Sequence, residues 1–264
     1  VSKQTGIPLI GRSLPIKNKS DEFATSVHVG EAFCNDFEVY RLERSYRAAL
    51  FDACVDAGDI NMANSYYLDE LEEMPSRTPI ANGNLQARCR MMYLYDIASR
   101  HKGLVMSTDN QTEYQLGFWT IHGDVGDFDP IQGLWKTEVY GLAKYILRKY
   151  ENEMRSLDEG HFYEEEDKLG AMHRAVVESI ALTPTDGLGI SNSDLDQIGA
   201  KSYYDVDRVL QTLTCKASPE NDKLQDELTA ELGPDVVGKI IQRHHNSRFK
   251  RLLSPIIVPR EMYD

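Results

Sequence analysis

Several features of secreted, membrane and nucleic-acid-binding proteins are missing from this sequence. The four cysteines form no Cys-x-x-Cys pair, which argues against a zinc site or a disulfide framework and favours a cytoplasmic location. No apolar run approaches the ~18 residues of a membrane span, and the opening residues do not resemble a signal peptide. With 42 acidic and 29 basic residues, the net charge is −13, which argues against nucleic acids and anionic membranes as partners.

Common catalytic signatures are absent as well. The seven histidines include no His-Glu-x-x-His motif, and no Gly-x-Ser-x-Gly nucleophile motif occurs. Two glycines never stand side by side, so no phosphate loop built on a Gly-Gly pair is present. What remains is a chain of 264 residues, 41% of them hydrophobic, which is long enough for one α/β domain with added helices.

Short apolar runs alternate with amphipathic segments over the first part of the chain. Strands are expected at 7–15, 37–42 and 103–107, and helices at 19–35, 43–57, 84–100 and 136–150. This alternation favours an α/β fold in which a parallel sheet is covered by helices. Residues 117–130 are expected to form a loop, and the last helix is expected at 234–245. We predict a single domain over 1–264, with an α/β core at 1–150 and a mainly helical C-terminal extension at 151–264.

Polar residues follow directly on the third expected strand. Ligands of parallel α/β sheets bind beyond the carboxyl ends of the strands, so Thr108, Asp109 and the next helical turn suit a phosphate or a metal–phosphate ligand. Glu113 would repel a bare phosphate there but could hold Mg²⁺, which prefers oxygen ligands. The helix dipole alone is a simpler explanation of an acidic residue at this position.

Basic residues at two other places are candidates for binding an anion. Lys136 stands at the expected start of a helix, where a cation is electrostatically unfavourable, and this hints at a nearby anion. Arg88 and Arg90 lie two residues apart and point to different faces of one helix. A guanidinium suits phosphate or carboxylate, although simple solvation at the surface explains both arginines too.

Six spaced motifs lie in one block from Asn84 to Ile146. In chain order they are Asn84–Met91, Ser107–Glu113, Gly117–Asp124, Asp127, Asp129-Pro130 and Leu134–Val139. Together they closely resemble the ammonia-dependent NAD synthetases, which are N-type ATP pyrophosphatases with a Rossmann-like, adenine nucleotide α-hydrolase-like fold. Later segments follow the same family order, namely Pro184–Asp186, Asp194–Tyr203 and Lys250-Arg251 with Pro255.

The resemblance implies a carbon–nitrogen ligase of NAD biosynthesis. In this family the nicotinate carboxylate of deamido-NAD attacks the α-phosphorus of ATP, which gives an acyl adenylate and pyrophosphate. Ammonia then attacks the adenylate and releases NAD and AMP. The residues implied to contact ATP are Thr108, Lys136 and Thr185, the implied Mg²⁺ ligand is Glu113, and those implied to contact deamido-NAD are Arg88, Asp127 and Lys250. The family also implies a homodimer.

Differences from the family pattern leave alternatives open. The family's Ser-Gly-Gly-x-Asp-Ser loop does not occur, and because the sequence opens with Val1 we expect an upstream segment of at least ~30 residues. Without such a segment, a non-catalytic nucleotide-binding dimer scaffold stays open. Ile121 and Phe249 stand where the family has lysine and histidine, which keeps open an ATP pyrophosphatase acting on another carboxylate. The sequence assigns no role to two segments longer than usual, 151–182 and 215–245.

Overall fold

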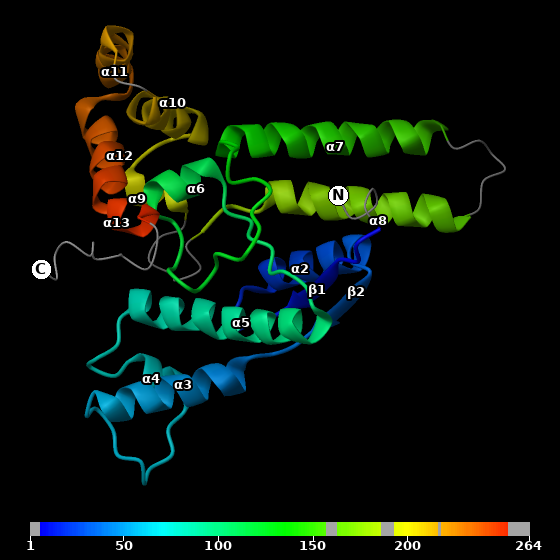
Figure 1. Ribbon diagram of the computed structural model, residues 1–264, viewed down its shortest axis with the longest axis vertical. Coiled ribbons are helices and arrows are strands. Elements are labelled where there is room, and N and C mark those ends of the chain that lie inside the picture. Colours follow the sequence, from blue (N-terminus) through cyan, green and yellow to red (C-terminus); the bar gives the residue numbers. More distant parts are fainter. Residues whose placement is uncertain (1–5, 157–162, 186–192, 216–217, 253–264) are drawn as a thin grey trace, which may run out of the picture. The chain divides into compact units, whose positions relative to one another are not determined.

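Helices dominate the computed structural model, which describes residues 6–156, 163–185, 193–215 and 218–252 (Figure 1). The chain divides into two compact units that are interleaved along the sequence. The first unit combines Val1–Val105 with Tyr140–Ile190, and the second combines Met106–Val139 with Ser191–Asp264. These units differ from the expected parts at 1–150 and 151–264, and the single domain over the whole chain stays a prediction.

The first unit contains a small parallel sheet. Strands β1 (Ile10–Ser13) and β2 (Asp36–Val39) pair with Ile10 opposite Asp36. Helix α2 (Ser20–Phe33) connects the strands and packs against both. Gly30 permits this close approach, because a Cβ at that position would collide with the ring of Phe37. The elements confirm the strand, helix and strand that were expected at 7–15, 19–35 and 37–42.

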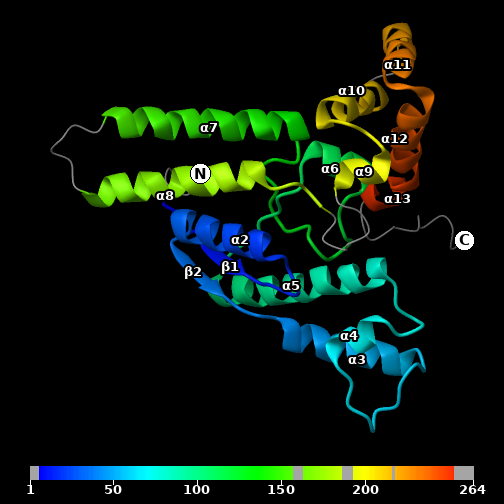
Figure 2. The ribbon, with the colours of Figure 1, turned by 180° about the vertical axis from the view of Figure 1, so that it is seen from behind.

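Further helices of the first unit include α3 (Glu43–Asp56), α4 (Leu68–Glu72), α5 (Pro79–His101) and α8 (Tyr163–Ala181). Helix α3 packs against α4 and α5, and α8 packs against α2 (Figure 2). Helix α5 was expected from residue 84 but begins at Pro79, because the Thr78 hydroxyl accepts a hydrogen bond from the N–H of Ala81. The buried core of this unit comprises Leu14, Ile16, Leu42, Tyr46, Leu50, Cys54, Leu71 and Cys89.

The second unit is built around short helices with a core of their own. These helices are α6 (Gln111–Leu116), α9 (Asp194–Ile198), α10 (Tyr203–Thr214), α11 (Pro219–Leu232), α12 (Pro234–Asn246) and α13 (Arg248–Arg251). Helix α10 contacts α6, α11 and α12. Helix α12 confirms the helix expected at 234–245, and the short α13 follows it. The buried core comprises Leu116, Ile198, Val206, Val209, Leu210, Leu228, Val237 and Ile240.

The strand expected at 103–107 is not present as a strand. Only an isolated parallel bridge joins Met106 to Phe128, and the segment between α6 and the next long helix is a loop, as expected for 117–130. That next helix, α7, runs over Lys136–Ser156, longer than the expected 136–150. Its first residues, through Val139, belong to the second unit. In the part of the chain that the structure describes, no helix is long and apolar enough to span a membrane.

Candidate active site

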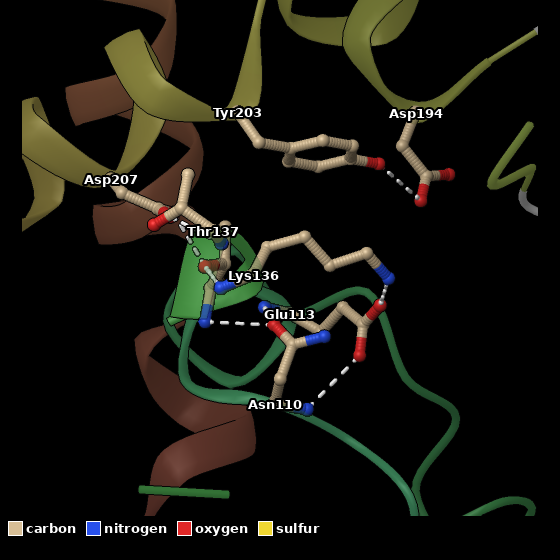
Figure 3. Close-up of polar contacts among 8 residues, drawn as sticks. Asn110, Glu113, Lys136, Thr137, Asp194, Tyr203 and Asp207 are labelled. Atoms are coloured by element: carbon tan, nitrogen blue, oxygen red, sulfur yellow. Dashed lines mark hydrogen bonds and ion pairs between the residues drawn. The ribbon is translucent and has the colours of Figure 1, made fainter. Parts of the chain in front are cut away.

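An ion pair stands at the centre of the candidate site in the second unit. The Lys136 ammonium donates to Glu113 Oε1 with an Nζ–Oε1 distance of 2.6 Å, and the two side chains are only 14% and 17% exposed (Figure 3). Lys136 begins α7 and Glu113 lies on α6, so the pair joins the starts of two helices. The unfavourable position of a lysine at a helix start is therefore offset by a carboxylate of this same chain.

Local sequence fixes the position of Glu113. Asn110 caps α6, because its Oδ1 accepts from the backbone N–H groups of Thr112 (3.1 Å) and Glu113 (3.2 Å). The Glu113 Oε2 in turn accepts from the N–H of Asn110 at 3.0 Å, which completes a capping box. Both Glu113 carboxylate oxygens are thus engaged, one by Lys136 and one by the cap.

The position of Lys136 is fixed by residues far away in the sequence. Its backbone N–H donates to Thr112 Oγ1 at 2.8 Å, and the Thr112 hydroxyl donates to Asp207 Oδ1 at 2.5 Å. Asp207 Oδ2 accepts from both the N–H (3.0 Å) and the hydroxyl (2.8 Å) of Thr137. Thr112 and Asp207 are almost completely buried, so the side chains that hold the first turn of α7 are shielded from solvent.

An aromatic ring lies beside the ammonium group. The Lys136 Nζ is 5.6 Å from the centroid of the Tyr203 ring, close enough for a cation–π contribution. The Tyr203 hydroxyl lies 3.4 Å from Asp194 Oδ2 and donates to it, and Asp194 is buried (Figure 3). Glu113 of α6, Tyr203 of α10 and Asp194 of α9 therefore form the surroundings of this cation.

Further carboxylates surround Asp109, immediately before the cap of α6. Burial raises the pKa of Asp109 to about 8, and the negative charges of Asp124, Glu113 and Asp129 add to this effect, whereas Lys136 opposes it. Within the described residues, Asp109 Oδ2 and Asp129 Oδ2 are buried and have no hydrogen-bond partner. Uncompensated oxygens of this kind are energetically costly, and cations satisfy them well.

Lys250 of α13 occupies a different part of the second unit. Its ammonium donates to the carbonyl oxygen of Gly117 at 2.7 Å and to that of Trp119, whose ring centroid is 5.5 Å away. Burial lowers the pKa of Lys250, while Asp124 raises it. Gly117 adopts a left-handed conformation with φ at +67° directly after α6, and a Cβ there would collide with Ser247.

The structure brings together some of the predicted site residues. Five of them belong to the second unit, namely Thr108, Glu113, Asp127, Lys136 and Lys250. Glu113 and Lys136 are in contact, whereas Thr108 and Asp127 are exposed. Arg88, which is exposed on α5, and Thr185, which follows α8, belong to the first unit. Of the later motif residues, Asp186 and Pro255 lie outside the described residues.

Sequence reasoning missed Asp207 and Thr112. Their hydrogen bond joins residues 95 positions apart, so no local spacing could have identified it. Arg90, by contrast, has a structural role, because its Nε donates to the carbonyl oxygen of Leu14 at 3.0 Å.

Comparisons with known proteins agree with one another. The NAD synthase family model matches residues 48–254. An NH(3)-dependent NAD(+) synthetase of Chlorobium phaeobacteroides is 35% identical over 186 residues, which are 70% of this chain and 57% of that protein. One of Thermoplasma acidophilum is 28% identical over 96% of this chain and 85% of that protein. The chain thus spans less than two thirds of the Chlorobium protein.

Solved structures support the same fold. The structure of NMN synthetase from Francisella tularensis matches with a TM-score of 0.63 and 22% identity over 98% of this chain and 81% of that one. NH3-dependent NAD synthetase from Campylobacter jejuni matches with a TM-score of 0.54 and 19% identity over 94% of this chain and 76% of that one. These similarities confirm the expected fold class, a parallel sheet covered by helices of the adenine nucleotide α-hydrolase type with a largely helical C-terminal part. Because the family model matches more than half of its residues, the chain belongs to the NAD synthase family.

Proposed function

We propose that this chain carries out ammonia-dependent NAD synthesis, in which ATP activates the nicotinate carboxylate of deamido-NAD and ammonia displaces AMP. The observation that supports this most is the ion pair between Glu113, which we assign to the metal, and Lys136, which we assign to ATP. The Lys136 Nζ and Glu113 Oε1 atoms lie 2.6 Å apart, and each residue stands in the first turn of its helix. The chemistry needs few reacting side chains, because it depends on positioning and on charge neutralisation. The site provides charged side chains in fixed positions, namely those of Glu113 and Lys136.

Lys136 is the residue that we assign to the phosphates of ATP. Its ammonium is mostly buried, so its charge acts through a medium less polar than water and attracts an anion more strongly. Thr108 is exposed beyond the Met106–Phe128 bridge and offers a hydroxyl for the same ligand. We assign Thr185 to ATP as well, on the strength of the family resemblance.

The carboxylates near Glu113 suit Mg²⁺. In the described part of the chain, no three His, Cys, Asp or Glu side chains are grouped to hold a metal ion. Mg²⁺ commonly uses only one or two protein carboxylates together with water and substrate phosphate, however. Glu113 and the unbonded Asp109 Oδ2 could supply such ligands once Lys136 turns towards the nucleotide. The ion would neutralise phosphate charge when bound.

We assign Lys250, Asp127 and Arg88 to deamido-NAD. Lys250 already donates to two backbone carbonyl groups next to Trp119, so its ammonium is oriented before any ligand binds. Pre-organised donors reduce the entropy that binding must overcome. We further propose a homodimer in the cytoplasm, in line with the four free thiols.

The decisive experiment measures AMP formation by the intact protein. We expect AMP only when ATP, Mg²⁺, deamido-NAD and ammonia are all present, with one NAD formed for each AMP. A buffer without ammonia is the matched control, and light scattering at working concentration tests the dimer. Nicotinate mononucleotide is the informative competitor, because the Francisella relative is named an NMN synthetase. Steady AMP formation with that acid and none with deamido-NAD would refute the proposal.

A further inference from the structure

Asp207 is a buried carboxylate that accepts hydrogen bonds from two helices other than its own. It lies on α10 among apolar core residues, and only 2% of it is exposed. Its oxygens accept hydrogen bonds from Thr112 Oγ1 of α6 and from the N–H and Oγ1 of Thr137 of α7. A buried carboxylate is costly unless such donors compensate its charge.

These bonds act on the backbone that carries Lys136. The N–H of Thr137 is one of the first amide groups of α7 and has no acceptor within its own helix. Asp207 satisfies it from outside, in the way that a capping residue normally would. Thr112, which is bonded to Asp207, accepts from the N–H of Lys136 itself.

The same network reaches the partner of Lys136. Thr112 precedes Glu113 in the first turn of α6, and both N–H groups share the Asn110 cap. The Asp207 carboxylate therefore fixes the spacing between the helix that holds Glu113 and the helix that holds Lys136 (Figure 3). It contacts neither Lys136 Nζ nor Glu113 directly through any hydrogen bond of the described network.

We propose that Asp207 is a positioning residue for ATP binding, because it locks the first turn of α7 against α6 and so fixes the backbone from which Lys136 reaches the nucleotide phosphates. This inference rests on the proposed function, since it assumes that Lys136 binds ATP. It adds a residue that lies outside the ligand contacts assigned above.

The test compares dissociation constants for ATP and for deamido-NAD in the intact protein by calorimetry. Asp207→Asn keeps the size of the side chain but replaces one acceptor oxygen by an NH2 group, so it cannot accept all three hydrogen bonds. We expect ATP binding to weaken at least tenfold and deamido-NAD binding to change less than twofold. Thr137→Val removes only the hydroxyl bond and is expected to give a smaller loss of ATP binding, of about threefold.

A matched control separates positioning from general loss of stability. Ser218 caps α11 in the same unit, where its Oγ accepts from the N–H of Asn221 at 3.2 Å. Ser218→Ala is expected to lower the melting temperature and to leave both dissociation constants within twofold. If Asp207→Asn weakens both ligands equally, or leaves ATP binding unchanged, the positioning role is refuted.

A double variant tests whether Asp207 acts through Lys136. Once Lys136→Met has removed the ammonium, adding Asp207→Asn should weaken ATP binding by less than threefold further. A second full tenfold loss would overturn the inference. If the unaltered protein binds ATP but forms no NAD, the proposed reaction fails while this comparison still holds. If the unaltered protein binds no ATP, both proposals are refuted.

Discussion

Asp109 should make the second unit less stable as the pH rises. Its pKa is about 8 in the folded protein and 3.8 as the ordinary value. Below pH 4 the carboxyl group is protonated in both the folded and the unfolded chain, so it does not lower the free energy of unfolding. As the pH rises from 4 towards 8, this free energy falls, because the group ionises in the unfolded chain but stays protonated in the folded one. We expect Asp109→Asn to remove this loss.

The magnitude follows from the shift. Each pH unit in this window corresponds to about 1.4 kcal/mol, so between pH 5 and pH 8 the unaltered protein should lose up to about 4 kcal/mol relative to the variant. With a urea slope of about 2 kcal/mol per M, even half of this moves the midpoint by about 1 M. The effect therefore exceeds the error of the measurement.

Tryptophan fluorescence provides the assay. Both tryptophans, Trp119 and Trp135, belong to the second unit and report on the part that contains Asp109. Urea titrations of both proteins at pH 5, 6, 7 and 8, without divalent cations, should diverge as the pH rises. Asp226→Asn, at an exposed position of α11, is the control and should show no such divergence. A difference between Asp109→Asn and the parent that stays constant with pH would refute the reasoning.

Three further substitutions test the site. Lys136→Met should weaken ATP binding at least tenfold in calorimetry with an unchanged circular dichroism spectrum, because it removes the cation and leaves Glu113 with the cap alone; unchanged affinity would contradict the assignment. Glu113→Gln should raise the Mg²⁺ concentration for half-maximal AMP formation at least tenfold, and an unaltered Mg²⁺ dependence would remove Glu113 as ligand. Gly117→Ala should lower the free energy of unfolding by about 2–3 kcal/mol in urea titrations, because φ is +67° and a Cβ meets Ser247; a loss below about 0.5 kcal/mol would refute this.

Local signals predicted helices α2, α3, α5, α7 and α12, and two errors show which signals were underused. Helix α5 was expected from residue 84, yet Asn82 and Gly83, which are poor helix formers, are buried inside the helix. Tertiary contacts outweigh their propensity, since Asn82 Nδ2 donates to the carbonyl oxygen of Glu72. The Thr78-Pro79 pair, a cap followed by proline, would have marked the true start.

The cap of α6 could have been read more closely. Thr108, Asp109 and Asn110 are three consecutive residues that can cap a helix. A capping box needs its acidic residue three positions after the cap, which selects Asn110 for Glu113. The capping box accounts for the position of Glu113, and the role of Glu113 towards a metal stays a proposal.

Non-local contacts set the limit of prediction from sequence. Lys136 at a helix start indicated a nearby anion, but the sequence could not show that Glu113, 23 residues earlier, is that anion. The run at 103–107 has the composition of a strand, but it forms only a bridge at Met106 because pairing depends on a partner elsewhere in the chain.

The hydrogen bond between Thr112 and Asp207 has a consequence for the order of folding. Translation at 5–20 residues per second separates the synthesis of these two residues by roughly 5–20 s, since 95 positions lie between them. During that interval α6 and the start of α7 exist without the carboxylate that joins them. The contacts between α6, α7 and α10 in the second unit can therefore form only after α10 has emerged from the ribosome. Until then the residues between Thr112 and Asp207 form a loop whose ends are not joined.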